Sequence, residues 1–119
     1  MKLFESVPSI IDKHFESLGL DYELNEDRCM ILAYACAAVD ELIESNKDIE
    51  EYTADVEIDD TDSIVIELKT NVFVIDGGKT DPLFKSIRDA DKLVFSYVDD
   101  DTVSLKITFS NLWRLKNIE

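Results

Sequence analysis

The chain has 119 residues, 45% of them hydrophobic, a composition that predicts one globular domain spanning residues 1–119 around a single core. Its formal net charge is −15, and the excess lies in residues 1–78, which hold 20 acids and 5 Lys or Arg, whereas residues 79–119 hold 7 of each. Such a surface repels phosphate groups, which argues against direct binding of nucleic acid or of an anionic membrane and is compatible with a basic protein partner.

The first predicted element is a helix over residues 3–18. Its apolar residues recur every three or four positions, as on one face of a helix: Leu3, Val7, Ile11, Phe15 and Leu18. Proline is tolerated only in the first helical turn, so Pro8 places the start of the regular helix near Ser6, and Gly19 ends it. Residues 20–24 then alternate between apolar and acidic, which predicts a short strand or connector.

A second helix over residues 26–46 is predicted to be the central core helix. Residues 29–39 carry no charge and are rich in Ala, the best helix former, and Asn25 is suited to cap the start. A membrane-spanning helix needs about 20 apolar residues, so this run is too short to cross a bilayer. A helix that is apolar nearly all round is expected to be buried. Its small residues would let a sheet approach closely: Ala33, Ala35, Ala37 and Ala38.

The two cysteines indicate the cellular compartment. Cys29 and Cys36 are two helical turns apart, about 10 Å, which is too far for a disulfide, so we expect buried thiols in a reducing environment. After Lys2, the acids Glu5 and Asp12 interrupt any apolar stretch of signal-peptide length. Together these features predict a cytoplasmic protein.

Two strands are predicted after the central helix. Residues 52–58 alternate as a half-buried strand, residues 59–63 form a polar turn, and residues 64–69 form the second strand. Thr70 and Asn71 are either a turn or a bulge in a longer strand that continues to residue 75. The inward side chains are predicted to be Ala54, Val56, Ile58, Ile64, Ile66 and Leu68.

A third, short helix and a hairpin complete the prediction. Gly77 and Gly78 break the strand pattern, and Asp81 and Pro82 suit a helix start. The inward residues of this helix would be Leu83, Phe84, Ile87 and, at its limit, Ala90.

Residues 92–98 and 102–109 are predicted to pair as a hairpin about residues 99–101. One face of the hairpin would carry Leu93, Phe95, Tyr97, Val103, Leu105, Ile107 and Phe109, while Ser104, Lys106 and Thr108 face water. Leu112, Trp113 and Leu115 are expected to fold back as a terminal turn over an open edge of the core. The order ααββαββ predicts an α+β two-layer sandwich, with a mostly antiparallel sheet packed against two or three helices.

The sequence predicts neither a metal site nor a cofactor nor a catalytic residue. His14 is the only histidine, so a zinc site is not expected, and an exposed or half-exposed helical residue is the simpler interpretation. The acidic turns at 59–62 and 99–101 fail the calcium-loop pattern, because Ile64 and Val103 stand where a fifth-position oxygen is needed. Residues 77–80 resemble the final part of a phosphate-binding loop, but Phe73 stands where that motif has its first glycine.

Three acids at the end of the central helix break a local rule. Asp40, Glu41 and Glu44 lie where the helix dipole disfavours negative charge, at a cost of about 0.3–1 kcal/mol each when exposed. Such a violation marks either a site or a helix end that is kept soluble by its charge.

Residues 26–109 resemble the histidine-kinase-like ATPase superfamily, including the anti-sigma-factor kinases. The resemblance lies in an Ala-rich helix ending in Glu41-Leu42-Ile43-Glu44-Ser45, two strands, a glycine break, a helix and a hairpin. It implies that Glu41 occupies the position that activates water or a hydroxyl, and that Asp76 and Gly78 contact adenine. Ser45 stands where the family has a magnesium-binding Asn, so the resemblance implies a degenerate site that does not hydrolyse ATP.

Three hypotheses for function follow. The first is a small, acidic, non-catalytic protein-interaction or regulatory module that binds a basic partner. The alternative is a nucleotide-binding domain with a degenerate site at Glu41, Ser45, Asp76 and Gly78. A further alternative is an acidic DNA mimic, which requires its acids to lie in ordered rows on one face. A homodimer formed through an exposed sheet edge is compatible with each of these.

Overall fold

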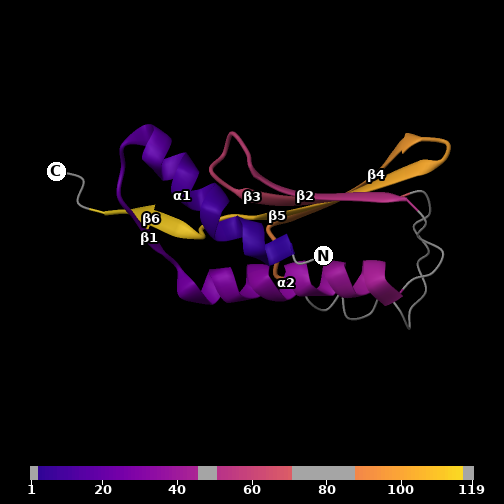
Figure 1. The fold of residues 1–119 in the computed structure, drawn as a ribbon, viewed down its shortest axis with the longest axis horizontal. Coiled ribbons are helices and arrows are strands. Elements are labelled where there is room, and N and C mark those ends of the chain that lie inside the picture. The colour runs from indigo at the N-terminus through magenta and orange to yellow at the C-terminus, as the bar shows by residue number, and fades with distance from the viewer. Residues whose placement is uncertain (1–2, 46–50, 71–87, 117–119) are drawn as a thin grey trace.

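The structure, a computed structural model, describes residues 3–45, 51–70 and 88–116 (Figure 1). Within them the predicted α+β architecture with antiparallel sheets is confirmed. The elements are η1 Leu3–Ser6, α1 Val7–Leu18, β1 Tyr22–Leu24, α2 Glu26–Ser45, β2 Tyr52–Ile58, β3 Ile64–Thr70, β4 Lys92–Asp99, β5 Thr102–Phe109 and β6 Trp113–Leu115. The predicted third helix, the continuation of β3 beyond Thr70 and the two glycines lie outside the described residues, except that Ala90 lies in a loop before β4 and not in a helix.

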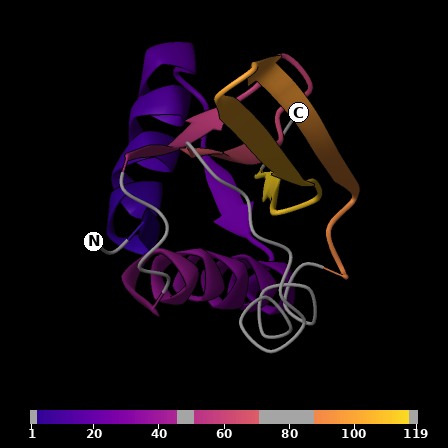
Figure 2. The same cartoon turned by 90° about the vertical axis from the view of Figure 1, so that its right-hand side faces the viewer.

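The main sheet has four antiparallel strands in the order β2-β3-β5-β4. Helix α2 runs beneath this sheet, and α1 stands beside it, in contact with β2 (Figures 1 and 2). A polar turn joins β2 to β3, as predicted: the Asp59 carboxylate accepts hydrogen bonds from the backbone N–H groups of Thr61 and Ser63 at 2.9 and 3.0 Å. These bonds hold the pKa of Asp59 below its ordinary value, with the Thr61 hydroxyl contributing most.

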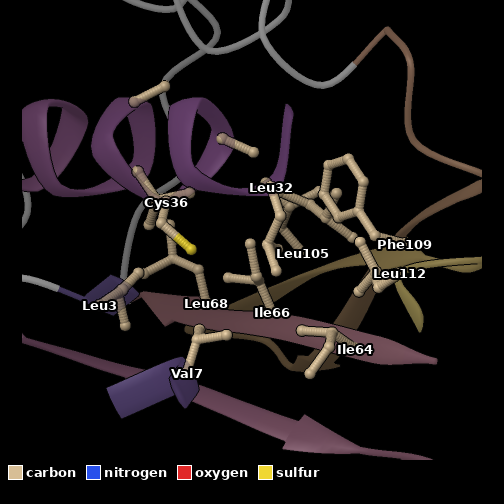
Figure 3. Close-up of a cluster of buried hydrophobic side chains, with 14 of the residues drawn as sticks. Leu3, Val7, Leu32, Cys36, Ile64, Ile66, Leu68, Leu105, Phe109 and Leu112 are labelled. Atoms are coloured by element: carbon tan, nitrogen blue, oxygen red, sulfur yellow. The ribbon is translucent and has the colours of Figure 1, made fainter. Parts of the chain in front are cut away.

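The core lies between α2 and the sheet. The predicted alternation is confirmed by the register, because Ile66 lies opposite both Val56 and Ile107 on one face. Figure 3 shows Leu32 and Cys36 pointing from α2 toward this layer of side chains. The buried apolar residues include Leu3, Val7, Ile11, Phe15, Leu32, Cys36, Val39, Leu42, Ile64, Ile66, Leu68, Leu105, Ile107, Phe109 and Leu112.

The prediction that α2 is buried all round is wrong. Leu32, Cys36 and Val39 are fully buried, but Met30 and Tyr34 are 54% and 61% exposed. The reason is geometric: a single sheet covers one side of a helix, and the opposite side of α2 is covered by none of the elements that the structure describes. Cys29, expected to be buried, is half-buried.

Two further corrections concern the end of the chain. Residues 113–115 form β6, which pairs with β1 in a separate two-stranded antiparallel sheet, where a turn was expected. Phe15 of α1 packs on this sheet, with ring centroids 4.4 Å from Tyr22 and 5.3 Å from Trp113. Ser104, expected to face water, is buried. It lies on an inner strand, and its hydroxyl is 3.5 Å from the Glu67 carboxylate.

Arg28 ties the start of α2 to both ends of the β4–β5 hairpin. Its Nη2 lies 2.6 Å from the Asp91 carboxylate, and Nη1 and Nε donate to the carbonyl oxygens of Asp89 and Ser110, both at 3.3 Å. The same Asp91 oxygen accepts the Ser110 N–H at 2.6 Å. Next to this network, the Asn25 N–H donates to the carbonyl of Leu112 at 2.7 Å. These bonds fix the position of α2 beneath the sheet.

Candidate functional site

A groove of about 360 Å³ lies between η1 and the second half of α2. Its lining combines an apolar floor with four carboxylates, and consists of Phe4, Glu5, Ala33, Ala37, Asp40, Glu41 and Glu44. The groove exists because two small side chains, Ala33 and Ala37, follow each other one helical turn apart on α2, where larger residues would fill the space.

The elements on either side of the groove are held together by one hydrogen bond and one buried side chain. The backbone N–H of Leu3 donates to Asp40 Oδ2 at 3.0 Å, which joins η1 to α2. The Leu3 side chain is 5% exposed and belongs to the core. Asp40 Oδ2 therefore has a structural role. This role is a reason for an acid to stand at this position of α2, although the helix dipole disfavours it there.

The other oxygen of Asp40 has no hydrogen-bond partner among the described residues, although it is buried. Burial raises the pKa of Asp40, against the opposing effects of the Leu3 N–H and of the positive charge at the N-terminus, and the nearby Glu44 and Glu5 carboxylates raise it further. A buried carboxylate oxygen without a donor costs free energy on the order of 1–3 kcal/mol. The groove thus lies beside a buried carboxylate whose negative charge is incompletely compensated, and a cation bound in the groove would offset that charge through space.

The residues predicted from the kinase-like resemblance are only partly described. Glu41 is exposed and lines the groove. Ser45 is the last residue of α2, and its side chain is outside the described part of the chain, as are Asp76 and Gly78. Whether Glu41 meets Asp76 and Gly78 in one site therefore stays a prediction.

Sequence reasoning identified the three acids at the end of α2 but missed Phe4 and Glu5. Phe4 packs at the edge of the core and lines the groove. The paired alanines of α2 are the signal that pointed to a close approach of another element. The alanines do not indicate which element approaches them, because that depends on a long-range contact that no local sequence pattern encodes.

Other candidates have structural explanations. His14 is half-buried on α1 and packs edge-on against Phe15, with ring centroids 5.1 Å apart. Its Nε2 lies 3.3 Å from Asp62 Oδ1, close enough for an ion pair when the imidazole is protonated, but not aligned for a hydrogen bond. Across residues 3–45, 51–70 and 88–116, no three His, Cys, Asp or Glu side chains are grouped to hold a metal ion. No described helix is long and apolar enough to cross a membrane.

Comparisons with protein-family models, with curated proteins and with solved structures find no match to this chain.

Proposed function

We propose that the chain is a non-catalytic interaction module, and that its groove binds a Lys- or Arg-bearing segment of a partner protein. Long basic side chains have an apolar stem and a charged end. The groove offers the matching surfaces, since Ala33, Ala37 and Phe4 would contact the stem, and Glu41 and Glu44 would lie near the charged end.

The observation that carries this proposal is the combination of an apolar floor with a carboxylate that is short of a donor. Asp40 Oδ1 is buried without a partner in the described part of the chain, beside two further acids of the same helix. Hydrogen bonds from Lys or Arg to carboxylates are among the stronger polar contacts in proteins. The net charge of −15 would also attract a basic partner from a distance and speed the encounter.

A binding experiment with a fluorescent amphipathic peptide of Lys and Leu tests the proposal. The double variant Glu41→Gln with Glu44→Gln removes two charges from the groove, and Glu16→Gln with Glu57→Gln removes two exposed charges elsewhere. We expect the groove variant to weaken binding roughly fivefold or more, because an exposed ion pair contributes up to about 1 kcal/mol. The control should change binding by less than about twofold. Equal losses in both variants, or no saturable binding at low salt, would refute the proposal.

A nucleotide-binding site at the same place is the second proposal, favoured by the position of Glu41 in a groove large enough for part of a ligand. The charges of the groove oppose it, because a triphosphate would approach four carboxylates. A nucleotide that binds only the folded chain raises its melting temperature. No shift with ATP or ADP at about millimolar concentration and magnesium would exclude this alternative.

The DNA-mimic hypothesis remains a proposal with less support. On the outer face of the sheet, Glu67 lies 3.7 Å from the Lys69 ammonium and 3.5 Å from that of Lys106. Because the Lys69 and Lys106 ammonium groups lie beside Glu67, this part of the outer face does not present an unbroken row of acids. Competition between this chain and duplex DNA for a DNA-binding protein would support the hypothesis, and absence of competition would count against it.

A further inference from the structure

Strand β4 is an edge strand of unusual composition. It ends the four-stranded sheet, and β5 is its hydrogen-bonded neighbour (Figure 1). All eight of its residues are exposed, including Val94 at 37%, Tyr97 at 85% and Val98 at 52%. In the part of the chain that the structure describes, no strand pairs with its other edge.

The middle of β4 lacks the charges that usually protect an edge strand. Residues 93–98 are uncharged, and apolar side chains occupy both faces, since Leu93 shares the face of Ile107 while Val94 shares the face of Lys106. Strands covered on both faces have such continuous apolar runs, whereas edge strands are normally protected by charges, by prolines, by bulges or by a covering element.

The opposite edge of the same sheet shows that protection. Strand β2 carries the exposed acids Asp55 and Glu57, and η1 and α1 pack against it. On β4 the charged residues are Lys92 and Asp99, at its two ends, and its one protective feature, the bulge between Tyr97 and Asp99, lies at the end next to the turn and leaves residues 93–96 regular. The two edges of the sheet therefore differ in how far they resist pairing with another strand.

We propose that β4 pairs with β4 of a second copy of this chain, antiparallel across a two-fold axis near Ser96. An isologous contact of this kind joins the two sheets into one continuous eight-stranded sheet with both α2 helices on the same side. It places the apolar side chains of the two β4 strands beside each other on both faces of the joined sheet, where cross-strand neighbours contact each other.

Charge complementarity favours a second copy as the occupant. In an antiparallel pair about Ser96, Lys92 of each chain lies near the acidic turn at residues 99–101 of the other, so two sets of opposite charges meet. The hairpin also belongs to residues 79–119, which hold 7 acids and 7 Lys or Arg, so the contact avoids the acidic part of the chain.

Sedimentation of the full chain at about 0.5 M salt, where charge repulsion is screened, measures the dimer. We expect wild type to dimerise reversibly, and Ser96→Lys to raise the dissociation constant at least about tenfold, because it puts like charges opposite each other at the axis. The control is Thr53→Lys, an equal charge change on the exposed part of β2, and it should leave the dissociation constant unchanged. A wild type that stays monomeric at about 0.5 mM, or equal effects of both lysines, would overturn the proposal.

Cysteine cross-linking tests the register independently. Opposed residues of an antiparallel pair have Cα atoms about 4.5–5.5 Å apart, within reach of a disulfide. Mild oxidation of Ser96→Cys should give a covalent dimer, whereas Thr53→Cys and wild type should give none. If Ser96→Cys and Thr53→Cys cross-link to the same extent, the contact is not through β4. Far-ultraviolet circular dichroism of each variant confirms that it is folded, which these exposed positions permit.

Discussion

Replacing Arg28 with alanine should destabilise the fold more than any comparable change at an exposed arginine. The guanidinium makes three polar contacts, to the Asp91 carboxylate and to the carbonyls of Asp89 and Ser110. At a net value of about 0.5–1.5 kcal/mol each, these contacts stabilise by roughly 1.5–4.5 kcal/mol.

Two effects reduce this figure. The Asp91 side chain is 38% exposed, so solvent screens its ion pair with Arg28. Arg28 also lies in the first turn of α2, where the helix dipole disfavours a cation by about 0.3–1 kcal/mol. We therefore expect Arg28→Ala to lower the free energy of unfolding by about 1.5 kcal/mol, which for a domain of this size lowers the melting temperature by roughly 6 °C.

The measurement is urea and thermal denaturation followed by circular dichroism. Arg114→Ala is the matched control, because Arg114 also pairs with an acid, Glu23 at 2.8 Å, but its side chain is 78% exposed. We expect a loss below about 0.5 kcal/mol for the control. Arg28→Lys should fall between the two, since it keeps the charge but not the planar fork of donors. Equal losses for Arg28→Ala and Arg114→Ala would refute the view that this network holds α2 under the sheet.

Three further predictions concern titrating groups. The pKa of Asp40 is raised from 3.8, chiefly by burial, so the folded chain binds the proton of this carboxyl group more tightly than the unfolded chain does. Wild type therefore loses stability as the pH rises through the raised pKa. Asp40→Asn should therefore melt higher than wild type at neutral pH, and the difference should shrink near about pH 4; a difference independent of pH would contradict this cause. Burial raises the pKa of the Cys36 thiol to about 12, so a thiol reagent at about pH 8 should modify half-buried Cys29 first and Cys36 only as the chain unfolds. In the variant Cys29→Ser, only the slow reaction of Cys36 should remain. The hydroxyl of Tyr22 donates to Asp12, which raises the pKa of Tyr22 to about 12; Asp12→Ala should return its tyrosinate absorbance titration toward 10.0, and an unchanged titration would exclude this hydrogen bond as the cause.

The local elements could be predicted from the sequence because their signals are local. Alternation over residues 52–58 matches β2 at both ends, since side chains on a strand alternate between faces whatever lies beyond them. Gly19 ends α1 in the left-handed conformation, φ 65°, which glycine adopts without steric cost. Asn25 precedes α2, and its side chain accepts the Arg28 N–H at 3.4 Å, as a cap should.

The tertiary structure decided which surfaces these elements hide. An uncharged helical segment such as residues 29–39 can be buried on one side or on all sides, and the position of the sheet on one side of α2 leaves Met30 and Tyr34 exposed. The groove likewise depends on η1 meeting α2 across 37 residues of chain, from Leu3 to Asp40. The strand pairing of residues 22–24 with residues 113–115 spans nearly the whole chain. Such contacts depend on the path of the whole chain, and hydrophobic periodicity specifies only the face that must be covered, not the segment that covers it.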